Sequence, residues 1–177
     1  SYDFVIGMTK EALIKKMQER QASILNEAWN ARQPNLPINT KQEALILASI
    51  IEKETSLKTE RGKVSSVFVN RLLREIALQT DASVVYGITR GKKVLGRGLR
   101  RSELKKDTPW NTYVNKGLPP SPIGNPGKAS IHAALNPDIT NYLYFVADGS
   151  GGHAFAENLR EHNINVAKWR KIEKTDN

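Results

Sequence analysis

The stretch TKQEALILASIIEKET, residues 40–55, decides how the rest of the chain is arranged. Thr40, followed three places later by Glu43, has the form of a capping box, so a helix is predicted to begin here. Residues 44–51 are apolar around nearly the whole helix circumference, which predicts a helix buried in the centre of the domain. Glu52 and Glu54 follow as two carboxylates at the edge of this buried segment.

Two further helices are expected on either side of this segment. Residues 9–32 carry apolar side chains at helical spacing, with Thr9 as the N-cap, and the prolines within 33–37 end the pattern. Residues 60–78 repeat apolar side chains on one helical face and predict another helix. The core is therefore expected to be built mainly from helices.

The second half of the chain alternates loops with short regular elements. Over 82–87 we predict a short helix capped by Asp81 or a strand, followed by a basic Gly-rich hairpin or loop over 91–98 and an irregular Pro/Gly loop over 117–127. A helix capped by Asn125, with Pro126 first, is expected to end near 136–137. A strand over 142–147, a turn over 148–152, residues 153–155 pairing back and a last helix over about 156–171 complete the prediction. Helices around a small, mainly antiparallel sheet give an α+β domain.

Composition limits the class of protein. A chain of 177 residues without cysteine suits one domain, and it excludes a disulfide framework and a Cys-zinc site. The three histidines lack metal-ligand spacing, and no apolar run approaches the ~20 residues that span a bilayer. The net charge of +9 favours polyanionic partners, but the chain has no recognisable nucleic-acid readout motif. A basic nucleic-acid-binding domain is therefore the weaker alternative.

The two carboxylates at the end of the buried segment are the main candidates for chemistry. Glu54 lies three, four and seven places after apolar residues of the helix, whereas Glu52 lies on another face. Apolar neighbours and the negative end of the helix dipole both disfavour the anion, so we expect a raised pKa for Glu54, as a general acid requires. From the residues alone, a solvated helix end beside Lys53 and Lys58 is the commoner interpretation.

Several segments resemble, together and in order, the MltG (YceG-like) family of endolytic murein transglycosylases. The segment ASIIEKET, residues 48–55, closely resembles the family signature. The others are VFVNRL at 67–72, LQTD at 78–81, NTY at 111–113 leading to GLPP at 117–120, and YLYFVADG at 142–149 with GGH at 151–153. The resemblance is strong over about 40–165 and looser over 1–39.

The resemblance implies an enzyme of the bacterial cell wall. It implies cleavage between N-acetylmuramic acid (MurNAc) and N-acetylglucosamine (GlcNAc) inside peptidoglycan strands, leaving 1,6-anhydro-MurNAc ends. It also implies a single-span inner-membrane protein with this domain in the periplasm or facing the cell wall, working beside peptidoglycan synthases, the penicillin-binding proteins. The chain opens at Ser1 without Met, and we expect the anchor and most of a LysM-like region to lie outside it. A non-catalytic glycan-binding scaffold module is the alternative.

The expected mechanism uses one acid and neither metal nor cofactor. The C6 hydroxyl of the substrate itself attacks the anomeric carbon, so Glu54 alone would act first as acid and then as base. Glu52 is the alternative to Glu54. Asp81 is the candidate for a second carboxylate in three dimensions. We expect most of the polar or aromatic residues in or beside the matching segments to line one substrate cleft with Glu54: Asn70, Gln79, Asp81, Asn111, Tyr113, Asn125, His153 and Asn158.

Two expectations concern the organisation of the chain. Residues 1–39 are expected to form a helical lead-in at the edge of the preceding region, and 40–177 to form the catalytic domain. Residues 90–101 are more basic than the family leads us to expect. The basic stretch 90–106 that contains them either attracts anionic glycan or lipid or keeps a loop solvated.

Overall fold

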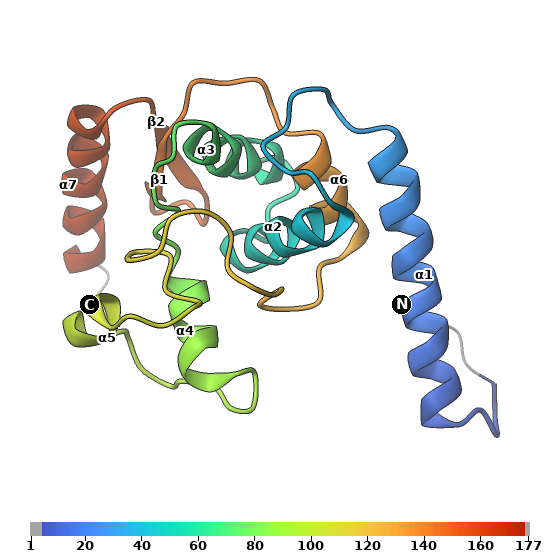
Figure 1. Cartoon of the computed structure of the whole chain (residues 1–177). Helices are drawn as coiled ribbons and strands as arrows, with labels where there is room; N and C mark the ends of the chain where they lie inside the picture. The colour runs from blue at the N-terminus through green and yellow to red at the C-terminus, as the bar shows by residue number, and fades with distance from the viewer. Residues whose placement is uncertain (1–4, 176–177) are drawn as a thin grey trace.

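The computed structural model of the chain describes residues 5–175. In that range the elements are α1 (Lys10–Asn30), α2 (Lys41–Glu54), α3 (Arg61–Leu73), α4 (Asp81–Thr89), α5 (Arg101–Lys105), α6 (Lys128–Leu135), β1 (Tyr144–Ala147), β2 (His153–Ala156) and α7 (Leu159–Thr175). The structure is mainly helical with one two-stranded antiparallel sheet, which confirms the predicted α+β class. Figure 1 shows α2, α3 and α6 in the centre, between α1 on one side and the hairpin with α7 on the other.

The central helix α2 forms as its sequence predicts. The Thr40 hydroxyl accepts a hydrogen bond from Glu43 N (3.1 Å), and Glu43 Oε2 accepts one from Thr40 N (3.1 Å), so the capping box is confirmed. Residues 46–51 are all buried, and α2 packs chiefly against α6 and α3. Because the middle of the helix is enclosed, the last turn of α2 is a place where buried structure meets the surface.

The hairpin of β1 and β2 covers one end of this helical core. Phe145 packs its ring edge-on against Phe68 of α3, with 5.9 Å between the ring centroids. The strand expected over 142–147 begins two residues late, because the side-chain amide of Asn70 donates to the carbonyl of Tyr142 and ties that segment to α3. The turn and the returning strand are confirmed, with Ala147 paired to His153.

Two predicted helix boundaries are wrong. α3 ends at Leu73 rather than near residue 78, because Glu75 turns the backbone to a φ of +52°. α6 begins at Lys128 with Gly127 as its N-cap, not at Asn125 and Pro126. The amide of Gly127 donates to the carboxylate of Glu52 (3.0 Å), so a distant side chain takes the role expected of Asn125.

Other elements resolve or refine the expectations. The segment after Thr80 is a helix, α4, and Thr80 rather than Asp81 is its N-cap residue. The basic region contains the short helix α5, which the sequence did not suggest. α7 starts at Leu159 rather than 156, because Ala156 still pairs with Tyr144 in the sheet.

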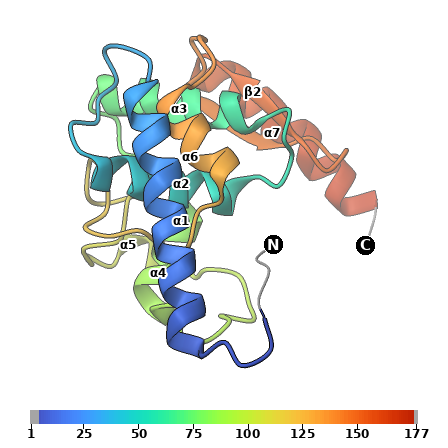
Figure 2. The same ribbon diagram turned by 90° about the vertical axis from the view of Figure 1, so that its right-hand side faces the viewer.

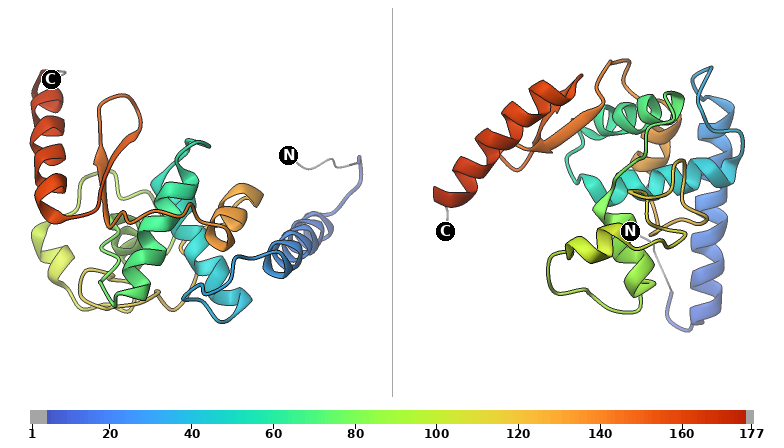
Figure 3. Two further views of the ribbon diagram at one scale, coloured as in Figure 1. Left: turned by 90° about the horizontal axis from the view of Figure 1, so that it is seen from above. Right: turned by 60° about the vertical axis from the view of Figure 1, so that its left-hand side comes forward.

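The first helix joins the core through one half of its length. Ala28 is fully buried, and Ile24, Leu25 and Trp29 pack against the core, whereas Ile14 is 53% exposed. Figure 2 shows α1 crossing in front of α6 and α2, and Figure 3 shows α1 and α7 at opposite ends of the molecule. Among the described residues, no helix has both the length and the apolar character to cross a membrane.

Candidate active site

Glu54 is the last residue of α2 and therefore stands where the buried helix leaves the core. Ile50 and Ile51, which precede it, have no exposed surface. Burial is the largest cause that raises the pKa of Glu54, the hydrogen bond from Thr80 lowers it, the charge of Asp81 raises it and that of His153 lowers it. The sum is a raised pKa, so this carboxyl group keeps its proton to higher pH than an exposed glutamate does.

The segment that joins α3 to α4 places a hydroxyl on this carboxylate. Thr80 Oγ1 donates a hydrogen bond to Glu54 Oε1. The segment is fixed by Thr112, whose carbonyl accepts from Gln79 N (3.0 Å) and whose Oγ1 accepts from Thr80 N (3.1 Å). Gln79 adopts a φ of +53°, which turns the chain so that Thr80 faces α2. The hydroxyl is therefore held by backbone contacts rather than by Glu54 alone.

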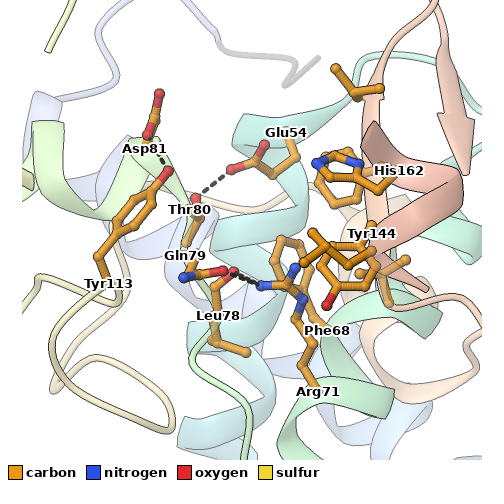
Figure 4. Close-up of a pocket in the computed structure, with 14 residues that line it drawn as sticks. Glu54, Phe68, Arg71, Leu78, Gln79, Thr80, Asp81, Tyr113, Tyr144 and His162 are labelled. Carbon is orange, nitrogen blue, oxygen red and sulfur yellow. Dashed lines mark hydrogen bonds between the residues drawn. The ribbon is translucent and has the colours of Figure 1, made fainter. Parts of the chain in front are cut away.

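Glu54 faces a pocket of about 510 Å³, a size within the usual range for small-ligand sites. Figure 4 shows Glu54, Thr80 and Asp81 on one side and Tyr144 with His162 on the other. The lining comes from α2, α3, the 78–81 segment, β1, α7 and the loop that carries Tyr113. The described residues that line it are Glu54, Val67, Phe68, Arg71, Leu78, Gln79, Thr80, Asp81, Tyr113, Tyr144, Phe145, Val146, Leu159 and His162.

Aromatic rings form two walls of this pocket. Tyr144 and His162 stack with 5.0 Å between the ring centroids. On the opposite wall the Tyr113 hydroxyl donates to Asp81 Oδ1 (2.6 Å). Burial and the neighbouring Asp81 raise the pKa of Tyr113, so it remains a neutral phenol. Flat aromatic faces and polar edges of this kind suit the apolar faces and hydroxyls of a sugar ring.

Arg71 of α3 forms the floor of the pocket and is only 7% exposed. Its Nε donates to Leu143 O (2.6 Å), and its Nη1 donates to Ala77 O (2.9 Å), Leu78 O (3.2 Å) and Gln79 Oε1 (3.1 Å). These bonds join α3, the 77–79 segment and the start of β1. Burial lowers the pKa of Arg71, but a guanidinium remains charged at any physiological pH.

A second acid, Glu60, anchors the hairpin beside the pocket. Its Oε1 accepts from His153 N (2.9 Å), and its Oε2 lies 2.9 Å from His153 Nδ1. Gly152 lies so close that a Cβ there would be 2.6 Å from Glu60 Oε1, so a side chain at this position would displace the Glu60 carboxylate. The pair fixes the position of the His153 ring, whose protonated form lowers the pKa of Glu54.

Glu52, the alternative acid, faces away from this pocket. Its Oε2 accepts from Gly127 N (3.0 Å) and from Ser130 Oγ (2.5 Å) at the start of α6. A carboxylate at a helix N-terminus satisfies free amides and meets the positive end of the dipole. Glu52 therefore links α2 to α6, whereas Glu54 lines the pocket.

The pocket brings together Glu54 and part of the predicted substrate-binding set. Gln79, Asp81 and Tyr113 line it directly. His153 is near enough to influence Glu54 electrostatically but does not line the pocket. The expectation that most of the eight residues share one cleft with Glu54 is therefore not met.

The remaining four asparagines are placed elsewhere, and hydrogen bonds explain three of them. The amide of Asn70 donates to the carbonyls of Thr140 and Tyr142 (both 2.9 Å). Asn111 has no exposed surface, and its amide donates to three backbone carbonyls. Asn158 Oδ1 accepts from Glu161 N (3.0 Å) at the start of α7. Asn125 lines a separate groove between α1 and α6.

Four pocket residues were missed as individual candidates: Arg71, Thr80, Tyr144 and His162. The first three lie inside the segments that carry the family resemblance, so that resemblance was the available signal. His162 lies on α7 outside the dense motifs, and nothing in its local sequence distinguishes it from a surface histidine.

Comparison with known proteins gives consistent matches. The model of the YceG-like family matches residues 1–168. An endolytic murein transglycosylase of Bacillus subtilis is 40% identical over 160 residues, which are 90% of this chain and 42% of that protein. One of Streptococcus pneumoniae is 33% identical over 175 residues, which are 95% of this chain and 30% of that protein.

A yceG-like protein of Listeria monocytogenes has a similar solved structure, with a TM-score of 0.70, 33% identity, and coverage of 92% of this chain and 51% of that one. The chain spans less than half the length of these two curated relatives.

Proposed function

The chain belongs to the YceG-like family, and from this premise we propose that it is the catalytic domain of an endolytic murein transglycosylase. Relatives that carry this name align with at least 90% of the chain. The observation that carries the proposal is Glu54, a carboxylic acid with a pKa raised by burial, at the edge of a pocket with aromatic walls. This is the combination that acid catalysis on a glycan requires.

In the proposed reaction, Glu54 serves first as acid and then as base. Its proton passes to the glycosidic oxygen as the bond between MurNAc C1 and the GlcNAc oxygen breaks. The C6 hydroxyl of the same MurNAc bonds to C1, and its proton returns to Glu54, so the acid is regenerated and a 1,6-anhydro end remains. The Thr80 hydroxyl supports the carboxylate during the interval in which it is charged. These proton transfers draw on neither metal nor cofactor.

A single acid distinguishes this reaction from ordinary glycoside hydrolysis, which uses two carboxylates. Asp81 lines the same pocket, but its Oδ1 accepts the Tyr113 hydroxyl. We therefore assign Asp81 to positioning Tyr113, with Gln79 and Tyr113 contacting sugar. Glu52 is engaged at the start of α6, which supports Glu54 over Glu52 as the acid.

The wider setting follows from the proposal. Residues 40–177 would form the catalytic domain and 1–39 its helical lead-in, although the second half of α1 also contributes to the core. The substrate would be the glycan strand of peptidoglycan, reached from the periplasmic side of the inner membrane by a full-length protein with a single anchor. Peptidoglycan synthases would be its partners there.

The decisive experiment is digestion of purified sacculi, followed by mass spectrometry of the released muropeptides. The protein is expected to yield 1,6-anhydro ends from within strands, and Glu54→Gln is expected to reduce their release by about 10²–10⁴-fold. Glu52→Gln is the matched control, because it makes the same chemical change two residues away and should remain active.

Three other results would each redirect the proposal. Reducing MurNAc ends in place of anhydro ends would indicate hydrolysis with Asp81 as the second carboxylate. Tight strand binding without any product would favour the non-catalytic glycan-binding module. An active Glu54→Gln protein beside an inactive Glu52→Gln protein would reverse the assignment of the acid.

A further inference from the structure

Arg71 brings an uncompensated positive charge into the pocket. The acceptors of its hydrogen bonds are three backbone carbonyls and the amide oxygen of Gln79, and all of them are neutral. No ion pair of Arg71 with an acid occurs among the described residues. Burying a charge without an opposite charge lowers stability. The positive charge therefore points to a use beyond holding the fold.

The acids of the pocket do not serve as its counterion. The pKa of Glu54 responds to burial, Thr80, Asp81 and His153, and Asp81 is bound to Tyr113 on the opposite wall. Arg71 instead lies against Tyr144, with 5.0 Å between the guanidinium carbon and the ring centroid. Figure 4 shows its side chain rising from α3 so that the guanidinium ends between Gln79 and Tyr144, inside the pocket.

One edge of this guanidinium is available to a ligand. Nε and Nη1 donate the hydrogen bonds that fix the group, and no hydrogen bond within residues 5–175 involves Nη2. The cation–π contact with Tyr144 and the hydrogen bonds of the other two nitrogens hold the group in place, so a ligand would meet a preorganised donor. Guanidinium groups match carboxylates and phosphates best among common anions.

We infer that Arg71 is an anion subsite that binds a carboxylate of the murein strand beside the bond cleaved at Glu54. This rests on the proposed function. The sugar rings, hydroxyls and acetamides of the strand are neutral, so the anionic groups are of two kinds. One is the lactyl carboxylate of MurNAc, which is free where the stem peptide has been removed. The other is a carboxylate of the stem peptide itself.

Binding to chemically defined strands tests the inference on the intact fold. GlcNAc–MurNAc oligomers would be titrated into Glu54→Gln protein by calorimetry as two pairs of forms. The first pair carries stem peptides, with their carboxylates either free or amidated. The second pair lacks stem peptides and carries lactyl groups either as free carboxylates or as methylamides. Neutralising the responsible carboxylate should weaken binding by roughly 10- to 100-fold, the range of a charge-assisted hydrogen bond. The pair whose two forms differ in affinity identifies which carboxylate, of the stem peptide or of the lactyl group, binds Arg71. Equal affinity within both pairs would overturn the inference.

A variant cycle separates charge recognition from support of the fold. Arg71→Gln in the Glu54→Gln background should lose the affinity difference between charged and neutral strands, and Arg71→Lys should recover part of it. Arg74→Gln, an exposed arginine at the end of the same helix, should retain the full difference. If Arg71 only supports the fold, Arg71→Gln should weaken binding of charged and neutral strands equally, and that result would overturn the inference. If the Arg71 variants unfold, the titrations of the Glu54→Gln protein decide the question.

Failure of this inference is distinguishable from failure of the proposed function. Wild-type protein that cleaves charged and neutral strands at the same kcat/KM would remain a transglycosylase without an anion subsite. Wild-type protein that cleaves none of the strands and no sacculi would contradict the proposed function itself.

Discussion

Thr80 donates its hydroxyl hydrogen bond to the carboxylate of Glu54, although 26 positions separate the two residues in the sequence. The bond joins the N-cap residue of α4 to the last residue of α2. Burial disfavours the charged form of Glu54, whereas this bond favours it. Burial and the hydrogen bond therefore shift the pKa of Glu54 in opposite directions. An acid that must later act as a base needs both, because it has to be stable first in its protonated form and then in its charged form.

Replacing Thr80 by Val should raise the pKa of Glu54 further, because burial then acts without the opposing hydrogen bond. If the protonated acid starts the reaction, the alkaline limb of the kcat/KM profile should move to higher pH. Release of anhydro-product from sacculi, measured from pH 5 to 9, checks this shift. Thr80→Ser keeps the hydroxyl and should keep the wild-type profile; an unmoved limb in Thr80→Val would mean that Thr80 does not tune the acid.

The features predicted correctly are those that depend on residues close together in the sequence. The capping box of Thr40 and Glu43 and the apolar run after it determine α2 within 15 residues of chain. The same helical spacing separates Glu54 from Glu52 by face, and the structure places these two carboxylates in different surroundings. The hairpin was predicted because its strand and Gly-rich turn are contiguous.

The features missed depend on contacts between distant segments. Asn70 and Asn111 were predicted to bind sugar, yet backbone carbonyls from other segments take up their amides. The sequence does not single out Arg71 within its segment, because the carbonyls and the ring around it come from the 77–79 segment and β1. No local pattern distinguishes a polar side chain used by the fold from one that faces a pocket.

Glu52 should contribute to stability rather than to chemistry. Glu52→Ala removes the acceptor for Gly127 N and Ser130 Oγ, so the free energy of unfolding should fall by about 1 kcal/mol, as for loss of a helix cap. Urea denaturation measures this change. Glu52→Gln retains an acceptor oxygen and should lose less. Glycan cleavage per folded molecule should persist in both variants, and its loss in a folded Glu52→Ala protein would give Glu52 a direct role.

Glu54 should make the protein less stable as the pH rises. A folded-state pKa raised above the unfolded value means that the favourable contribution is complete below about pH 4.5 and is lost as the pH rises through the folded pKa. Glu54→Gln has no charge to bury, so it should be more stable than wild type at pH 8 and similar at pH 4. Each unit of pKa shift corresponds to about 1.4 kcal/mol.

Thermal unfolding across this pH range measures the effect. Glu52→Gln is again the control, because it should not share the gain at pH 8. A Glu54→Gln protein with no added stability at pH 8 would argue that Glu54 is solvated rather than buried.

The basic stretch 90–106 should favour association of the protein with anionic surfaces and should not affect the proton transfers at Glu54. Two of its arginines are held by the fold: Arg90 lies 3.4 Å from the centroid of the Trp110 ring, and Arg97 pairs with Glu103 (2.6 Å). Its other basic residues are exposed and lie at the end of the molecule where Figure 1 shows α4 and α5. Exposed charges attract polyanions at low salt and are screened beyond ~10 Å at 0.1 M.

A variant that spares the two held arginines tests this role. Changing Lys92, Lys93, Arg101 and Lys105 to Gln should weaken sacculus binding several-fold at low salt, with the difference fading as salt rises. Cleavage of short soluble strands at saturation should be unchanged, because no proton transfer needs these residues. The control changes four exposed basic residues elsewhere, Lys10, Arg20, Lys168 and Arg170, which alters net charge equally. If both variants bind like wild type at every salt concentration, the stretch only keeps its loop solvated; if both weaken equally, net charge and not this surface governs the encounter.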